Sequence, residues 1–296
     1  MSTGPRYGWE PEAQQNPDTG GGGIPHGPLP RISLVIPSYN QADYIEDTIL
    51  SVLQQDYSNL ELIVVDAASN DGTAAILERY RDRFAVLIQE PDNGQSEAIN
   101  KGFRHASGEI LGWINSDDFL LPGALRTVAE LFRLHPTRDM VIGSGDVISA
   151  DQQFLRHVPG RDLSADTLLG FRQDRWILQQ ACFWSARLWK TVGGVDESLH
   201  LLMDYDLWFR FSALTEPIVT QRKLGAMRFY PEVKTLRQSA RLNSELAYVF
   251  GKNGAYEALR SLVTDLDSHH TGTADRLDHL ERHPAVRVLR RLRLLR

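Results

Sequence analysis

Two adjacent carboxylates, Asp117 and Asp118, are residues that could hold a metal ion. Neighbouring carboxylates repel each other unless a cation or solvent lies between them, and hard divalent ions such as Mg²⁺ and Mn²⁺ prefer oxygen ligands. The pair therefore suggests a divalent cation that bridges to a diphosphate. The alternative is that one or both side chains cap the helix that Pro122 opens, and the pair taken alone favours that alternative.

Polar residues also follow other apolar runs of the chain, at the points where strands would end. In a parallel α/β sheet, ligands bind at the carboxyl ends of the strands, so these residues are candidates for one common site. No Gly-x-Gly-x-x-Gly follows the first run and no P-loop motif is present, so both of those nucleotide-binding classes lack sequence support. The candidate segments are Pro37-Ser38-Tyr39-Asn40, Asp66, Pro91-Asp92-Asn93-Gly94-Gln95 and Asn115-Ser116-Asp117-Asp118.

The elements that must position these residues alternate between strand and helix patterns. The alternation predicts a parallel α/β sheet for the first half of the chain. Asp43 and Glu46 have the spacing of a capping box for the first helix. The predicted strands are residues 32–36, 60–65, 85–89 and 110–114, and the predicted helices are 43–54, 73–82, 95–106 and one that Pro122 opens.

Beyond residue 140 the pattern is less regular. It predicts a hairpin around residues 150–153, a helix over 207–214 and a short strand over 218–221. We expect these elements to complete the same sheet, without forming a separate domain.

The composition is that of a globular protein, with 296 residues of which 42% are hydrophobic and 24% charged. Residues 1–30 are rich in Gly and Pro and lack apolar periodicity, which predicts a flexible arm before a main domain over 31–240. We expect a helical extension over 241–296. No apolar run reaches the ~20 residues that cross a bilayer, and no signal-peptide pattern is present. With Cys182 as the only cysteine, a cytoplasmic protein is expected.

Charge is uneven along the chain, which carries a net charge of −6. The acidic body argues against nucleic-acid binding, which needs a broad basic surface. Residues 285–296 instead hold five arginines and no acid, and a helix there would be basic and amphipathic. Such a helix could lie peripherally on the inner face of an anionic membrane, or its leucines could dock on the protein or on a second subunit.

Five blocks, in this order, make the sequence resemble the family 2 glycosyltransferases over about residues 31–240. The resemblance implies an α/β GT-A fold, Rossmann-like, formed as a single domain with a mostly parallel central sheet. It also implies a nucleotide-diphosphate sugar donor, a divalent cation (Mn²⁺ or Mg²⁺), and transfer with inversion at the anomeric carbon. The blocks are ISLVIPSYN (32–40), VDAASNDGT (65–73), NGQSEAINKG (93–102), GWINSDD (112–118) and MDYDLW (203–208).

Site roles follow from the resemblance. Pro37, Tyr39 and Asp66 would frame the base, with Ser38 and Asn40 beside them, Asp117 would lie near the ribose and diphosphate, and Asp118 would be the metal ligand. Asp66 as an acceptor and Tyr39 as a stacking ring suit a pyrimidine, which favours a UDP- or dTDP-type donor. The alternatives are a turn residue for Asp66 and a partly buried aromatic for Tyr39. Gln95 and Asn100 could also reach the donor, although Gln95 could simply begin its helix.

Inverting transfer needs a base that removes the proton of the attacking hydroxyl, and Asp204 matches the aspartate of the family's acidic motif. Met203 stands where an acidic residue is common in the family. The alternative is that Asp204 or Asp206 caps the helix that follows, and for Asp206 the cap is the better interpretation.

The segment around Arg228 departs from the family, because Tyr230 occupies the position where a histidine often helps to hold the metal or diphosphate. Arg228 and Lys234 could still meet phosphates. Trp184 could line the acceptor side, although a core tryptophan is the more frequent case.

The leading hypothesis is a metal-dependent inverting glycosyltransferase acting on a glycan or lipid-linked acceptor in polysaccharide or glycolipid synthesis. The alternatives are a nucleotide-sugar binding protein that has lost turnover, for which Met203 and Tyr230 speak, and a nucleotidyltransferase, for which a Gly-rich basic loop is missing. The oligomeric state is not predicted.

Overall fold

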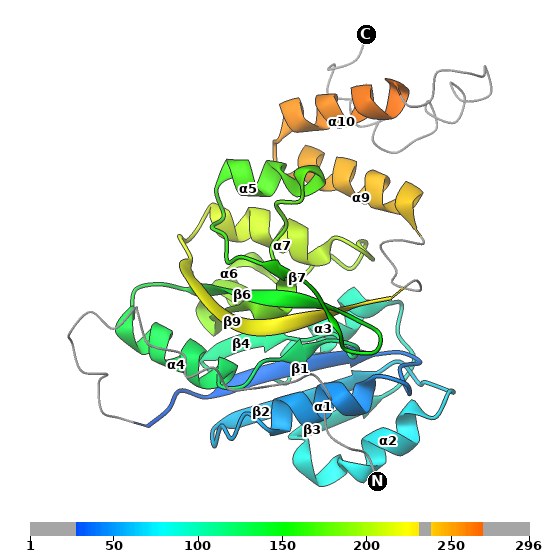
Figure 1. Cartoon of the computed structure of the whole chain (residues 1–296), viewed down its shortest axis with the longest axis vertical. Helices are drawn as coiled ribbons and strands as arrows, with labels where there is room; N and C mark the ends of the chain where they lie inside the picture. Colours follow the sequence, from blue (N-terminus) through cyan, green and yellow to red (C-terminus); the bar gives the residue numbers. More distant parts are fainter. Residues whose placement is uncertain (1–27, 231–237, 269–296) are drawn as a thin grey trace.

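Runs of Ile, Leu and Val form the central strands, because both faces of those strands are covered by helices. The computed structural model describes residues 28–230 and 238–268 (Figure 1). Its nine-stranded sheet has the order β3-β2-β1-β4-β8-β6-β9-β5, with β7 paired to β6. The strands are β1 (Ile32–Ser38), β2 (Leu60–Asp66), β3 (Val86–Gln89), β4 (Ile110–Trp113), β5 (Phe119–Leu120), β6 (Met140–Ser149), β7 (Phe154–Val158), β8 (Cys182–Ser185) and β9 (Ile218–Phe229).

The half of the sheet made of β3, β2, β1 and β4 is parallel throughout. In the β1–β2 register, Ser38 lies opposite Asp66, so these two strands end at the same edge. The second half adds antiparallel β8 beside β4 and a long parallel pairing of β6 with β9. The prediction that the second half completes the same sheet is confirmed, and so are the α/β class and the hairpin, which joins β6 to β7.

Helices cover both faces of the sheet, and each face has its own apolar core. Alternate side chains of β1 enter different cores, since Leu34 and Ile36 pack with α1 and α4 while Val35 packs with α3 and α7. Gly102 lets α3 approach β1 closely, because a Cβ there would lie 2.5 Å from Cγ1 of Val35. The longer helices are α1 (Ile45–Leu53), α2 (Thr73–Arg79), α3 (Gln95–Phe103), α4 (Ala124–Leu134), α5 (Ala165–Leu169), α6 (Ala186–Val192), α7 (Met203–Ser212), α9 (Ser239–Lys252) and α10 (Tyr256–Ser268), and the short 3₁₀ turns are Arg81–Arg83, Phe171–Gln173 and Gln179–Ala181.

Three local predictions were wrong. The helix expected from residue 207 begins at Met203, because Met203, Tyr205 and Leu207 already face the core. The strand expected over 218–221 continues to Phe229, because it pairs with β6 from Ile218 to Phe229, with two shifts of register. The capping box is absent, since Tyr44 is the cap residue of α1 and makes no side-chain cap. Glu46 instead pairs with Arg79 (2.9 Å) and accepts the hydroxyl of Tyr80 (2.7 Å).

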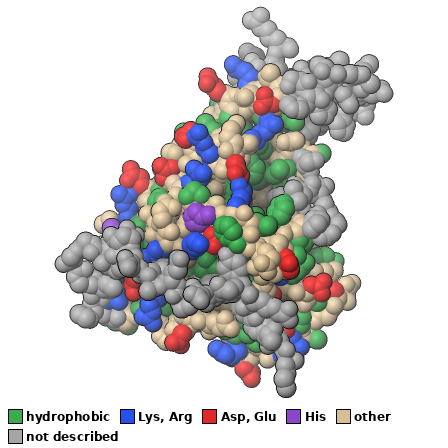
Figure 2. Space-filling model, in the orientation of Figure 1, with side chains coloured by type: hydrophobic (Ala, Val, Ile, Leu, Met, Phe, Trp, Pro, Cys, Tyr) green, Lys and Arg blue, Asp and Glu red, His purple; other side chains and the backbone are tan. Residues whose placement is uncertain are grey.

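Helices α9 and α10 lie at the end of the molecule farthest from α1 and α2, with α9 on the side of α7 and α10 beyond α9 (Figure 1). Their apolar residues, such as Phe250 and Leu259, join the same core as α7. No helix of the described ranges, 28–230 and 238–268, is long and apolar enough to cross a membrane. Acidic and basic side chains are interspersed over the face shown in Figure 2. Of the predicted arm (residues 1–30), only 28–30 belong to the described residues, and the basic segment 285–296 lies entirely outside them.

Candidate active site

The ends of β1 and β2 form the first part of the site. Asp66 is buried, and its carboxylate accepts hydrogen bonds from the backbone N–H (3.0 Å) and the hydroxyl of Ser69. Its local role is therefore to build the turn after β2. Beside it, the buried Ser38 hydroxyl has no hydrogen-bond partner among the described residues.

Tyr39 follows with 60% of its side chain exposed, on a loop that is firmly held. Asn40 adopts a left-handed conformation (φ 51°), its N–H donates to the Ser69 hydroxyl (2.8 Å), and its side-chain oxygen accepts the N–H of Asn70 (3.0 Å). The Asp71 carboxylate accepts hydrogen bonds from the N–H groups of Ala42 and Thr73, so it holds these two loops together. The two loops thus present the Tyr39 ring to solvent from a rigid base.

The two carboxylates after β4 differ sharply in their surroundings. Asp118 is only 2% exposed, and its oxygens accept the backbone N–H of Arg228 and the side-chain amide of Asn115, both at 3.0 Å. Burial and the charge of Asp117 hold the pKa of Asp118 well above its usual range. Asp117 is partly exposed and accepts the hydroxyl of Tyr230 at 2.7 Å. Of this pair, Asp117 is the carboxylate that reaches the surface, whereas the sequence favoured Asp118 as the metal ligand.

Arg228 lies beneath this pair and is 3% exposed. Its guanidinium pairs with Asp47 (3.0 Å), donates to the carbonyl oxygen of Asp117 (3.0 Å), and lies over the rings of Tyr44 and Phe119. The expectation that Arg228 meets phosphates is therefore not supported, since its donors are directed into the protein. It fixes the backbone around Asp117 and Asp118. Lys234 lies outside the described residues.

The first turn of α3 joins two parts of the site. Gln95 begins this helix and donates to the side chain of Asn115 (2.7 Å), while the next residue, Ser96, donates to the carbonyl of Leu199, close before α7. Asn100 holds the same region from the next turn, exchanging two hydrogen bonds with the backbone of Val195 (2.9 and 3.0 Å). Because both ends of its amide are engaged there, we leave Asn100 out of the proposed donor site.

Asp204 lies in the first turn of α7 and keeps some exposure to solvent. Burial, with a smaller effect from the charge of Glu245, raises its pKa to about 6, against the N–H of Tyr205 that donates to it (2.7 Å). Such a carboxyl is ionised at neutral pH and basic enough to accept a proton. Helix α7 packs on β4 through Trp208, which stacks on Trp113 at 6.3 Å.

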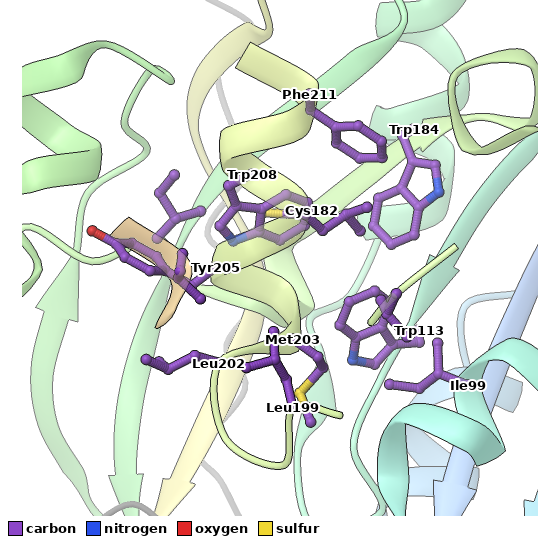
Figure 3. Close-up of a cluster of buried hydrophobic side chains, with 14 of the residues drawn as sticks. Ile99, Trp113, Cys182, Trp184, Leu199, Leu202, Met203, Tyr205, Trp208 and Phe211 are labelled. Carbon is purple, nitrogen blue, oxygen red and sulfur yellow. The ribbon is translucent and has the colours of Figure 1, made fainter. Parts of the chain in front are cut away.

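Trp184 lies in the core, and the suggestion that it lines the acceptor side was wrong. Figure 3 shows it among Trp113, Trp208 and Phe211, and its side chain is completely buried. The cap expected at Asp206 was also wrong, because that fully buried carboxylate pairs with Arg210 (2.9 Å) and Lys252 (3.0 Å).

The donor set fits a cation that is shared with a diphosphate, and does not fit one held by protein alone. No group of three or more His, Cys, Asp or Glu side chains within residues 28–230 and 238–268 could hold a metal ion. Divalent cations at phosphate sites are bound through one or two carboxylates together with phosphate oxygens, and the partly exposed Asp117 meets that requirement.

Sequence reasoning missed three residues that shape the site, Tyr44, Asp47 and Glu245. The Tyr44 ring lies against the Tyr230 ring (centroids 4.9 Å apart), and Asp47 pairs with Arg228. Both belong to the start of α1, where a search for polar groups after strands does not look. Glu245 lies beyond the blocks that carried the resemblance and accepts backbone N–H groups just before α7.

Comparison with known sequences identifies the family of the region that holds Tyr39, Asp66 and Asp117. A family model described as Glycosyl transferase family 2 matches residues 33–187. An uncharacterised glycosyltransferase of Rickettsia typhi is 32% identical over 187 residues, 62% of this chain and 58% of that protein. The putative teichuronic acid biosynthesis glycosyltransferase TuaG of Bacillus subtilis is 42% identical over 92 residues, 30% of this chain and 36% of that protein.

Two solved structures share the fold. TarS 1–349 of S. aureus in complex with UDP-GlcNAc has a TM-score of 0.62 at 18% identity, covering 76% of this chain and 66% of that one. The mannosyltransferase PcManGT of Pyrobaculum calidifontis, in complex with GDP-Man and Mn²⁺, has a TM-score of 0.56 at 20% identity, covering 90% and 83% of the two chains.

Proposed function

The chain belongs to glycosyl transferase family 2, and from that premise we propose that it moves a sugar from a nucleotide-diphosphate donor to an acceptor hydroxyl with inversion. The observation that carries the proposal is the linkage through the first turn of α3. Gln95 donates a hydrogen bond to Asn115, two residues before Asp117, and Ser96 donates one to Leu199 in the loop that leads to Asp204. A carboxylate suited to a diphosphate-bound cation and a carboxylate suited to proton removal are thereby tied to one element.

In the proposed reaction, the acceptor oxygen attacks the anomeric carbon from the side opposite the diphosphate. The bond between that carbon and the diphosphate oxygen breaks, the nucleoside diphosphate leaves, and the acceptor proton passes to Asp204. A divalent cation, when bound, stabilises the negative charge of the leaving diphosphate. Asp117 would hold the cation, and hydrogen bonds from Tyr230 and Arg228 keep Asp117 in place.

We propose Tyr39, Ser38 and Asp66 for the nucleoside, with Pro37 and Asn40 shaping their loop. The exposed Tyr39 ring suits stacking on a base, and the Ser38 hydroxyl lacks a partner among the described residues. A UDP- or dTDP-type donor is favoured because the Asp66 carboxylate keeps lone pairs beyond the two that Ser69 occupies and would accept a pyrimidine N–H. Structural neighbours bind UDP-GlcNAc and GDP-Man, so both belong in a test.

The acceptor that we propose is a glycan or a lipid-linked glycan in polysaccharide or glycolipid synthesis. The similarity to TuaG supports this class. With a lipid-linked acceptor, the basic segment 285–296 would keep the enzyme on the inner face of the membrane. Sedimentation with anionic vesicles, with and without that segment, tests this part, since equal partition of both forms would remove the membrane role.

A donor panel tests the function. UDP-GlcNAc, UDP-glucose, dTDP-glucose and GDP-mannose are each added with and without Mn²⁺, and the thermal midpoint and the release of nucleoside diphosphate are measured. We expect one donor class to stabilise the protein in a Mn²⁺-dependent way. Asp117→Asn should lose that dependence, whereas Asp82→Asn, at an exposed position on the turn after α2, should keep it. Binding without turnover would favour the binding-protein alternative, and the absence of both would reject the proposal.

A further inference from the structure

We propose that Glu245 of α9 is a positioning residue for Asp204, a role that rests on the proposed function. Glu245 lies outside the family-matched residues 33–187 and in the predicted C-terminal extension. Its carboxylate would hold the entrance of α7 so that Asp204 stays directed at the acceptor hydroxyl. Helix α9 would then be part of the catalytic apparatus.

The contact is a carboxylate cap supplied from another helix. Glu245 is 7% exposed, and its Oε1 accepts the N–H of His200 (3.0 Å) while its Oε2 accepts those of Leu201 (2.8 Å) and Leu202 (3.0 Å). Leu202 is the cap residue of α7 and has no polar side chain for the unpaired N–H groups at this end of the helix. Glu245 satisfies the N–H of Leu202 and holds the two residues before it. A negative charge at this end also suits the helix dipole.

A second attachment lies one turn further along α7. The buried Asp206 accepts hydrogen bonds from Lys252 (3.1 Å) and Asn253 (3.2 Å) at the end of α9, besides that from Arg210 (2.9 Å) of its own helix. Asp204 lies between Leu202 and Asp206, and both of these residues are hydrogen-bonded to α9 or to the residue at its end. Its backbone is therefore fixed by an element that the family model does not include.

The loop before α7 is also held from the opposite direction. Gly94, just before α3, lies so near His200 that a Cβ would come within 3.1 Å of its Nδ1, and the Ser96 hydroxyl donates to Leu199. The loop is thus contacted both by the start of α3 and by Glu245 of α9. Loss of Glu245 would remove the contacts with α9 and leave those with α3.

The charge of Glu245 gives the role a signature that packing alone does not have. Burial and the charge of Glu245 on α9 raise the pKa of Asp204, whereas the hydrogen bond from the N–H of Tyr205 lowers it. Cys182 of β8 and the Tyr205 hydroxyl are neutral at working pH, because burial and the charge of Asp204 raise the pKa of each. Arg241, which is 47% exposed, donates to Glu245 (3.2 Å) and offsets part of its charge.

The decisive experiment is the pH dependence of kcat in Glu245→Gln, measured as nucleoside diphosphate release from the panel donor that is turned over fastest. The variant loses the charge and one acceptor oxygen. We expect kcat to fall roughly tenfold with an unchanged donor KM. The acid limb of the profile should move to lower pH, because the charge that raises the pKa of Asp204 is gone.

Two further variants keep the test decisive if Glu245→Gln fails to fold. Arg241→Met removes a surface cation that partly offsets Glu245, so the acid limb should move to higher pH. Glu257→Gln makes the same chemical change at an exposed position of α10 and should match the parent. An unmoved limb in Arg241→Met, or parental kcat and profile in Glu245→Gln, overturns the positioning role. If Asp204→Asn itself keeps parental turnover, the assignment of the base fails instead.

Discussion

The phenolic hydroxyl of Tyr230 donates a 2.7 Å hydrogen bond to Oδ2 of Asp117, and this bond links the end of β9 to the carboxylate proposed for the cation. Tyr230 takes the position where the resemblance to family 2 led us to expect a histidine. Burial and the charge of Asp117 raise the pKa of the phenol far above its usual range, so it remains a neutral donor. Tyr230 thus orients the carboxylate that we propose for the cation.

Tyr230→Phe should raise the Kd for the donor with Mn²⁺ roughly tenfold, because a hydrogen bond to a charged group contributes about 1.5–3 kcal/mol. The ring contact with Tyr44 is retained, so folding should be preserved. Titration calorimetry measures the change. The matched control is Tyr80→Phe, which removes the 2.7 Å hydrogen bond from the Tyr80 hydroxyl, at the end of α2, to Glu46 of α1. Equal donor affinity in both variants would contradict the role of Tyr230.

Tyr39→Ala should weaken the binding of free UDP by roughly tenfold, since stacking of a base on an aromatic ring contributes about 1–3 kcal/mol. The thermal midpoint should hardly change, because the Tyr39 ring is largely exposed. Tyr256→Ala, at another exposed tyrosine on α10, serves as the control. If both variants bind UDP like the parent, the nucleoside lies elsewhere.

Arg228→Met should lower the free energy of unfolding by about 3 kcal/mol, because it leaves the carboxylate of Asp47 without its buried partner. Urea denaturation measures this loss. Arg79→Met removes the pairing of Arg79 with Glu46, the residue before Asp47, and should cost less than about 1 kcal/mol because Arg79 is exposed. A similar loss in both variants would contradict this role of Arg228.

The elements of the first half of the sheet could be predicted from sequence because their signals are local. Apolar runs marked β1, β2, β3 and β4 to within a few residues, and the polar residues after them located Tyr39, Asp66 and Asp117 at one edge. Apolar periodicity and turn chemistry act over a few residues, so a single sequence carries them.

The division of labour between Asp117 and Asp118 could not be predicted in the same way. It depends on the N–H of Arg228 and the hydroxyl of Tyr230, both more than a hundred residues away. Asn100 looked like a donor contact, and its role depends on the approach of Val195. Tertiary contacts decide such cases, because one residue type can bind a ligand or hold a loop equally well.

Asp204→Asn should also leave the fold intact. A carboxyl whose pKa is higher in the folded state than in the unfolded chain disfavours folding while ionised, and this penalty disappears as the pH falls below the unfolded pKa. The pKa of Asp204 is raised from 3.8 to about 6. The variant should therefore be more stable than the parent at about pH 8. Urea denaturation at about pH 8 and about pH 4 checks this, and a less stable variant at the higher pH would contradict the raised pKa.

The pH dependence of kcat for the parent and Asp204→Asn, from about pH 5 to about pH 9, tests most directly whether Asp204 is the base. Parental kcat should fall as the pH drops through about 6, because the base becomes protonated. The variant should bind donor normally, turn over roughly 10²-fold more slowly or worse, and lack that acid limb. Near-normal turnover in Asp204→Asn, or an acid limb that survives the substitution, would contradict the assignment of Asp204 as the base.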